Sequence, residues 1–317
     1  MGEIALITVA GQILMPLALL VWQWRGHCVS RMEWVLKSLV LCAYLGLTAV
    51  VGIGLLAPWY VPYGFAVLGA TASVSAWRGT GRCPVAQTDP WAARMRRGSW
   101  AAVAALCFAV LAWALSGYLP PGGPAVRLAS PLKNGEFYVV NGGYSILINP
   151  HMKTLERESL RAYRGQSYAL DIVKLNRYGF RAQGVWPRDL AGYEIFGEPL
   201  YAPCDGEVLF TEYRLPDRVP PEYDRQNPAG NFVYLQCSAA GVVLAHLMQS
   251  SVAVAPGDRV REGQRIGRVG NSGYSTEPHL HIHAQRSGGG ADFLAADPLP
   301  LQVEGRTLVR NSRIDAR

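Results

Sequence analysis

The sequence predicts an N-terminal α-helical membrane bundle of about four spans, followed by an all-β domain built from antiparallel sheets. The composition is too apolar for an ordinary soluble protein of 317 residues, since 17% of the residues are charged and 50% are hydrophobic. Charge is also uneven, because 8 of the 30 Lys and Arg residues and 3 of the 23 Asp and Glu residues precede Pro120. The chain therefore divides into a membrane half and a water-soluble half.

Four apolar segments account for the membrane half. Residues 4–24 and 34–56 are each about twenty residues of mostly Leu, Val, Ala and Ile, long enough to cross roughly 30 Å of hydrocarbon as helices. Residues 100–118 form a third candidate. Residues 61–77 are shorter and carry Pro62, Gly64 and several hydroxyl side chains, so topology has to decide whether they cross.

Basic residues predict which loops face the cytoplasm. Arg25 and Arg31 lie between the first two segments, and five arginines lie between residues 78 and 97. The positive-inside rule makes both loops cytoplasmic, which requires residues 61–77 to cross. The predicted location is therefore the cytoplasmic membrane, multi-pass, with everything after Tyr118 extracytoplasmic. Because no basic residue precedes the first apolar segment, it is expected to be an anchor rather than a cleaved signal peptide.

The water-soluble half is expected to begin with a linker. Residues 120–135 open with Pro120-Pro121-Gly122-Gly123-Pro124, which cannot continue a helix. Residues 136–317 form the predicted β domain, because strand-like runs recur there between turn residues. These runs are residues 137–141, 168–174, 207–213, 231–236, 242–247, 265–269 and 279–285.

The six cysteines fall into two groups. Four lie in or beside the apolar segments and are expected to pack as small apolar groups: Cys28, Cys42, Cys83 and Cys107. Cys204 and Cys237 lie in the domain assigned to an oxidising compartment, so a disulfide between them is expected, with two buried free thiols as the alternative. Metal binding by this pair is disfavoured, since no third soft ligand lies nearby in the sequence.

Three histidines alternate in the run Pro278-His279-Leu280-His281-Ile282-His283. On a strand, residues two apart point to the same face, so the imidazoles of His279, His281 and His283 project together while Leu280 and Ile282 face the core. Three imidazoles on one strand face indicate a metal site or an acid-base site.

The surrounding motifs resemble the lysostaphin/LytM-type zinc metallopeptidases, which have the duplicated hybrid motif fold. The resemblance covers roughly residues 168–285 and rests on four stretches in the family's order. They are Ala202-Pro203-Cys204-Asp205-Gly206-Glu207-Val208, Ala245-His246-Leu247, Gly257-Asp258-Arg259-Val260 with Gly263-Gln264-Arg265-Ile266-Gly267, and Gly270-Asn271-Ser272-Gly273-Tyr274-Ser275 before the histidine strand.

The resemblance implies a zinc ion, Zn²⁺, with Asp171 and His281 as ligands and with His246 and His279 as catalytic residues beside the metal-bound water. Three protein ligands leave the fourth zinc position open, so the metal can lower the pKa of water and polarise the scissile carbonyl. The two remaining imidazoles can carry a proton and donate to the developing oxyanion.

This sequence departs from the family at the first ligand. The family has a His four residues before the Asp, and here that residue is Ser167. The remaining histidine of the domain, His151, is expected to supply the missing metal ligand; otherwise the site is incomplete and the domain is a degenerate binder. His283 is expected in the second shell of the site or lining the groove, with a solvated histidine at the strand end as the alternative.

These features predict a membrane-anchored zinc metalloendopeptidase that hydrolyses peptide bonds, with peptidoglycan cross-links as the substrate class that the resemblance implies. The alternative is a catalytically silent LytM-like domain that binds wall peptides or regulates another hydrolase. A lipoyl or adaptor hairpin is disfavoured, since no lysine lies at the tip of residues 256–263. The expected partners are peptidoglycan peptides and the lipid bilayer. The net charge of +7 lies mainly in the membrane half, so nucleic-acid binding has no support.

Overall fold

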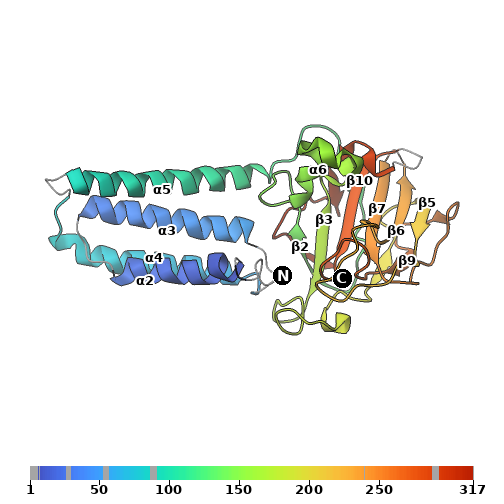
Figure 1. The fold of residues 1–317 in the computed structure, drawn as a ribbon, viewed down its shortest axis with the longest axis horizontal. Helices are drawn as coiled ribbons and strands as arrows, with labels where there is room; N and C mark the ends of the chain where they lie inside the picture. Colours follow the sequence, from blue (N-terminus) through green and yellow to red (C-terminus); the bar gives the residue numbers. More distant parts are fainter. Residues whose placement is uncertain are drawn as a thin grey trace. The chain divides into compact units, whose positions relative to one another are not determined.

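The computed structural model describes residues 6, 8–25, 30–52, 57–85, 91–238, 240–287 and 293–316. The chain forms two compact units, Met1–Ser116 and Gly117–Arg317. The first unit is helical and the second is dominated by β-strands (Figure 1).

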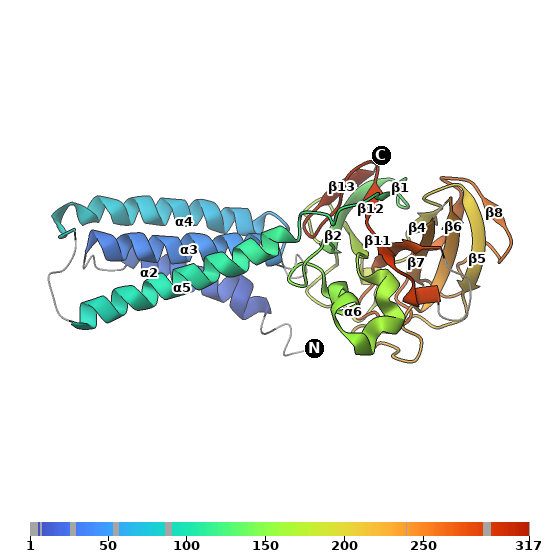
Figure 2. The same cartoon turned by 90° about the horizontal axis from the view of Figure 1, so that it is seen from above.

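The first unit packs its helices side by side (Figures 1 and 2). A small apolar core forms where Leu20, Leu41 and Phe65 meet, and Gly69 allows close approach because a Cβ there would lie 2.6 Å from a Leu45 methyl carbon. The elements are η1 (Ala10–Leu14, a π-helix), α2 (Met15–Arg25), α3 (Arg31–Val51), α4 (Val61–Arg78), η2 (Gly79–Arg82, a 3-10 helix) and α5 (Trp91–Ser116).

Two of these helices, α3 and α5, are long and apolar enough to cross a membrane among the residues that the structure describes. The first predicted segment is interrupted by η1, so the α-helical part α2 has 11 residues, and α4, with 18 residues, ends at the charged Arg78. The structure therefore supports two candidate spans rather than a clear set of four. The ends of the first two segments, residues 4–5 and 53–56, lie outside the described residues.

Helix α3 begins three residues earlier than the sequence indicated, because Ser30 caps it. The Ser30 hydroxyl accepts a hydrogen bond from the backbone N–H of Glu33 at 3.2 Å. The Glu33 carboxylate is buried and paired with Arg96 at 3.1 Å and Lys37 at 3.4 Å. Helix α5 begins nine residues early, so Arg94, Arg96 and Arg97, expected in a loop, are helical.

The second unit is built on one large sheet, which over the described residues has nine strands in the order β13-β2-β3-β10-β7-β6-β5-β8, with β11 beside β10. Neighbouring strands in this sheet pair antiparallel over the described residues, as the sequence predicts. The strands are β2 (Gly135–Asn141), β3 (Leu170–Leu175), β5 (Gly206–Glu212), β6 (Asn231–Cys237), β7 (Ala240–Leu247), β8 (Arg259–Val260), β10 (Leu280–Arg286), β11 (Pro298–Leu299) and β13 (Arg313–Ala316).

Two small strand pairs pack beside this sheet. β4 (Pro199–Tyr201) pairs antiparallel with β9 (Arg265–Arg268), while β1 (Val126–Leu128) pairs in parallel with β12 (Leu301–Val303). The parallel pair departs from the antiparallel prediction, and a long connection between the two strands permits it. Because β1 lies within residues 120–135 and Leu128 and Leu132 are buried, part of the segment expected as a linker belongs to the folded unit.

The strand β10 lies in the middle of the large sheet, hydrogen-bonded to β3 on one side and to β7 on the other (Figure 1). Leu280, Ile282 and Ala284 face the main hydrophobic core, which also contains residues of β2, β3, β6 and β7. The alternate residues of β10 therefore project from the opposite face of the sheet.

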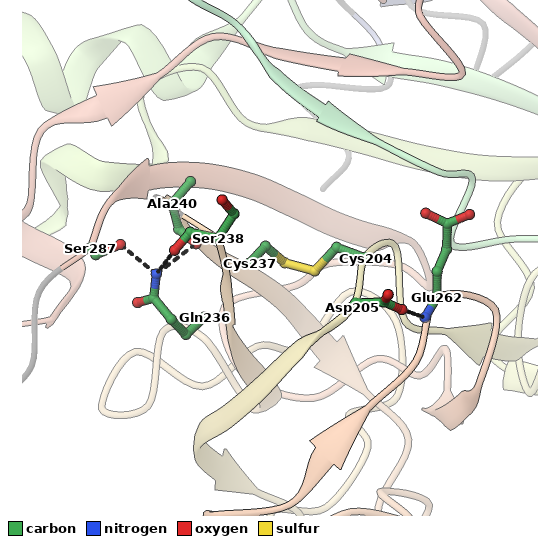
Figure 3. Close-up of a disulfide and its surroundings, with 8 residues drawn as sticks. All are labelled: Cys204, Asp205, Gln236, Cys237, Ser238, Ala240, Glu262 and Ser287. Carbon is green, nitrogen blue, oxygen red and sulfur yellow. Dashed lines mark hydrogen bonds between the residues drawn. A yellow bond between two sulfur atoms is a disulfide. The ribbon is translucent and has the colours of Figure 1, made fainter.

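A disulfide joins Cys204, just before β5, to Cys237 at the end of β6 (Figure 3). Beside it, the Asp205 carboxylate accepts a hydrogen bond from the backbone N–H of Glu262 at 2.7 Å. In the first unit, Cys42 and Cys107 are free among the described residues, whereas Cys83 is disulfide-bonded, so the expectation of a free apolar Cys83 is wrong. Cys28 lies outside the described residues.

Candidate metal centre

The cluster of histidines lies where β10, β3 and a short helical segment meet. His281 on β10 is paired directly with Asp171 on β3 and, on its other side, with Ala245 on β7. His151 reaches the same place from η3 (Pro150–Met152), a 3-10 turn. Strand register brings Asp171 and His281 together although 110 residues separate them.

Asp171 is the centre of the cluster. Its Oδ2 lies 3.0 Å from His151 Nε2, and its Oδ1 lies 2.9 Å from His281 Nδ1 and 3.6 Å from His279 Nε2. Ligand atoms of His151, Asp171 and His281 all lie within 4.8 Å of one another. Two imidazole nitrogens and one carboxylate oxygen converging in this way form a donor set that fits a metal ion with an open position.

The charges of the cluster also suit a metal. Burial alone would raise the pKa of Asp171, but His151, His279 and hydrogen bonds from His151 and His281 outweigh it, so its pKa lies well below the usual range. Burial lowers the pKa of His281, and it lowers the pKa of His246 well below the usual range. The site therefore favours an ionised Asp171 beside a neutral His281, the protonation states in which these groups coordinate metals.

Ser167 occupies the position where the resemblance would place the first metal ligand, but its hydroxyl contacts Arg164 and Thr154. Its hydroxyl is buried, donates to the Arg164 carbonyl at 2.6 Å and lies 2.9 Å from Thr154 Oγ1. Thr154 in turn donates to the backbone carbonyl of His151 at 2.8 Å. Ser167 thus lies against the segment that carries His151, with its hydroxyl proton directed to the Arg164 carbonyl.

Asn149 fixes the start of the same segment. Its side-chain oxygen accepts a hydrogen bond from the His151 N–H at 3.1 Å, and its amide nitrogen donates to the Gly143 carbonyl at 2.8 Å. Asn149 is fully buried, so the turn that carries His151 is attached to the body of the domain.

His246 and His279 lie together on the other side of the cluster, with ring centroids 4.8 Å apart. The Nδ1 of His246 lies 2.9 Å from the Ser272 carbonyl, and the Nδ1 of His279 lies 2.8 Å from the Glu277 carbonyl. Because a carbonyl oxygen only accepts, each Nδ1 carries the proton. In the neutral form of each ring, Nε2 is then left as the acceptor.

His283 is buried, and its Nδ1 lies 3.0 Å from His281 Nε2. The alternative of a solvated histidine at the strand end is therefore wrong, because η4 (Glu158–Gln166), a 3-10 helix, packs against β10 there. The ring of His283 therefore contacts the ring of His281, the candidate ligand on the same strand.

Asn141 is a residue of the site that the sequence did not single out. Its amide nitrogen donates to Asp171 Oδ2 at 2.8 Å, from the neighbouring strand β2. In the sequence Asn141 precedes Gly142 and Gly143 and resembles an ordinary turn residue, so no local signal could have identified it.

A buried ion pair supports His279 and was also missed. Arg181 Nε donates to Glu277 at 3.0 Å and 3.2 Å, and its Nη2 donates to the same carboxylate at 2.7 Å. Glu277 is the residue whose carbonyl oxygen holds His279. Arg181 lies 96 residues earlier, in a loop where an arginine has no distinctive sequence context.

An antiparallel sheet with a His-Asp-His cluster and two further imidazoles defines a β domain with a candidate metal centre. Residues 189–293 match Peptidase family M23. The match includes His246, His279, His281 and His283, whereas His151 and Asp171 precede it. This part of the second unit is therefore similar to Peptidase family M23.

Three relatives match parts of the chain. The chain is 37% identical over 86 residues to the peptidoglycan DD-endopeptidase ShyA of Vibrio cholerae, and 46% identical over 155 residues to the glycyl-glycine endopeptidase ALE-1 of Staphylococcus capitis. It is 33% identical over 184 residues to an uncharacterized metalloprotease of Haemophilus influenzae. These matches cover 27%, 47% and 57% of this chain and 17%, 38% and 34% of the respective relatives.

Among solved structures, the catalytic domain of lysostaphin from Staphylococcus simulans matches with a TM-score of 0.24 and 24% sequence identity. The match covers 37% of this chain and 84% of that one.

Proposed function

We propose that this chain is a membrane-anchored, zinc-dependent endopeptidase that hydrolyses peptide bonds in peptidoglycan cross-links. The observation that carries the proposal is the convergence of His151, Asp171 and His281 beside the paired rings of His246 and His279. The match of residues 189–293 to a peptidase family supports the reaction class. The names of the relatives from Vibrio and Staphylococcus support the peptide substrate class.

His151, Asp171 and His281 would hold the zinc ion. When bound, zinc supplies Lewis acidity toward the scissile carbonyl and toward water. Asp171 contributes the negative charge that binds the cation, and the neutral ring of His281 offers a nitrogen lone pair. The three residues come from three separate elements, and His151 is the most exposed of them, with 20% of its side chain accessible.

His246 and His279 would move the proton. Each ring is held at Nδ1 by a backbone carbonyl, so each Nε2 is oriented to accept a hydrogen bond or a proton from water. A ring protonated at Nε2 can then donate to the developing oxyanion or to the departing amine. Two rings in contact allow one to accept a proton while the other donates.

The test measures zinc content and cleavage of peptidoglycan peptides on the purified full-length chain. We expect about one zinc per chain in the wild type. Zinc and cleavage should both be lost in His151→Ala and in His281→Ala, and His246→Ala should lose cleavage while it keeps zinc. Lys153→Ala, an exposed neighbour of His151, is the control and should keep both.

The outcomes separate the parts of the proposal. Zinc retained in His151→Ala would overturn the assignment of His151 as a ligand and leave the zinc site itself standing. A wild-type chain that binds no zinc and cleaves nothing would replace the enzyme by a domain that binds wall peptides or regulates another hydrolase.

The membrane part of the proposal is a multi-pass anchor that places the second unit outside the cytoplasm. The two candidate spans α3 and α5 support membrane attachment, and the Cys204–Cys237 disulfide supports an oxidising compartment for the second unit. Cys83, in the loop before α5, is disulfide-bonded, which counts against the cytoplasmic position proposed for that loop, because disulfides are rare in the cytoplasm.

Reporter fusions after residue 85 and after residue 120 test this topology. Opposite sides of the membrane are expected for the two fusions, with the second one extracytoplasmic. A fusion after residue 120 that reports a cytoplasmic position would overturn the proposed location, and equal positions for the two fusions would show that α5 does not cross.

A further inference from the structure

Arg310 is a buried cation next to the candidate metal centre, in the segment between β12 and β13. Its side chain donates from Nε to the Ile148 carbonyl at 2.8 Å and from Nη2 to Asn141 Oδ1 at 2.7 Å. Its backbone N–H donates to the Gly142 carbonyl at 3.1 Å. Arg310 is 4% exposed, so these contacts are shielded from water.

The contact with Arg310 determines which way the amide of Asn141 points. A guanidinium group has only donors, so it must face the side-chain oxygen of Asn141. The nitrogen of the same amide then faces Asp171 Oδ2, where it donates at 2.8 Å. The two hydrogen bonds are mutually consistent, and together they define one orientation of Asn141.

The backbone places Asn141 for this contact. The pairing of β2 with β3 shifts register between Val139 and Asn141, so Asn141 lies opposite Asp171 rather than one position away. Such an irregularity re-aims a side chain relative to the regular alternation of a strand. The carboxylate of Asp171 is thus approached by Asn141 from the strand on one side and by His281 from the strand on the other.

Arg310 is connected to Asp171 through Asn141. Burial lowers the pKa of Arg310 to about 10, so the guanidinium is still charged at neutral pH. The Asn141 amide lies between the two charged groups, since it accepts from Arg310 Nη2 and donates to Asp171 Oδ2.

We propose that Asn141 and Arg310 are positioning residues of the metal centre, with Arg310 orienting the Asn141 amide and Asn141 orienting the carboxylate of Asp171. The inference rests on the proposed function, because it takes Asp171 to be a metal ligand. Ligating carboxylates are themselves hydrogen-bonded, and loss of such a partner commonly weakens metal affinity by about 10- to 100-fold.

The test measures the affinity of the full-length chain for Zn²⁺ by competition with a chelator, together with the unfolding temperature of the metal-free chain. Asn141→Ala should weaken Zn²⁺ affinity by about 10- to 100-fold. Arg310→Met should weaken it by a similar factor, and Arg310→Lys should recover part of the loss because the lysine ammonium can still donate a hydrogen bond to Asn141 Oδ1. Arg313→Met removes a contact with Glu136 at a partly exposed position nearby and should leave Zn²⁺ affinity unchanged.

A double variant separates an effect of Arg310 that passes through Asn141, here called the relay, from a general effect of Arg310 on stability. If Arg310 acts through Asn141, then Asn141→Ala with Arg310→Met should bind Zn²⁺ about as well as Asn141→Ala alone. Additive losses in the double variant would overturn the relay. Arg310→Lys and Asn141→Ala keep the inference testable if Arg310→Met fails to fold.

Failure of the inference is distinguishable from failure of the proposed function. If wild type binds Zn²⁺ and Asn141→Ala binds it equally well, with only the unfolding temperature lowered, then Asn141 is merely structural and the inference is overturned. If the wild type binds no Zn²⁺, the proposed function fails and the inference with it.

Discussion

Replacing both Cys204 and Cys237 with alanine should destabilise the second unit by a calculable amount. The bond closes a loop with a sequence separation of 33 residues. For a loop of this length, the entropy removed from the unfolded chain corresponds to about 3.7 kcal/mol at 25 °C. Cys237 is also buried against the main core, so loss of its sulfur adds to the effect rather than offsetting it.

Pulse proteolysis in urea measures this change on the full-length chain, because it reports the fraction of the second unit that is unfolded. With a urea dependence of about 2 kcal/mol per molar, the midpoint should fall by about 1.9 M. The measurement is made with chelator present, so that metal binding does not add to the stability of either variant.

Two controls accompany the variant. Wild type treated with reductant breaks the bond without removing sulfur atoms and should show most of the shift. The variant with Cys42 and Cys107 replaced by alanine removes the same number of sulfurs from free positions in the other unit and should leave the midpoint of the second unit unchanged. A midpoint of the Cys204→Ala, Cys237→Ala variant within about 0.3 M of wild type would refute the chain-entropy reasoning.

Three further predictions use the same unit. Arg181→Met should lower the free energy of unfolding by about 3–5 kcal/mol, because it leaves Glu277 buried and unpaired. The double variant Arg181→Met, Glu277→Met should lose far less stability, and equal losses for the two variants in pulse proteolysis would contradict this. Burial lowers the pKa of His246 and His283 in the folded chain, so the unfolded imidazoles take up protons first and metal-free stability should decline as pH falls below 6.5. An unfolding midpoint that is constant from pH 7.5 to about 5 would count against that. At Gly230, φ is +62° and an added Cβ would lie 2.4 Å from the Ser272 carbonyl oxygen that contacts His246. Gly230→Ala should therefore lower both the stability of the second unit and the proposed rate of peptide cleavage. An unchanged cleavage rate would show that the backbone can move to accommodate the methyl group without displacing His246.

Local patterns in the sequence predicted the division of the chain and the face of the histidine strand. The alternation of His279, His281 and His283 with apolar residues follows from the two-residue period of a strand, which depends only on neighbouring backbone. The excess of apolar residues before Pro120 likewise predicts a different solvent for the first unit, although among its described residues only α3 and α5 are long and apolar enough to be candidate spans.

Boundaries were harder to predict than elements. Helix α3 begins at Arg31 because Ser30 caps it, and the segment after Pro124 pairs with β12, whose residues come near the end of the chain. A cap can be read from the sequence in principle, but a partner strand about 175 residues away cannot, since nothing local specifies it.

The composition of the candidate metal centre was decided by tertiary structure. Asp171 meets His281 through the register of β3 with β10, His151 arrives on a turn held by Asn149, and Asn141 is set by an irregularity in β2. Each of these contacts joins residues that are distant in sequence and depends on how strands pair around the shared core. The sequence by itself determined which side chains were available and which way the histidine strand presents them, and only the packing of the whole sheet decided which of them meet.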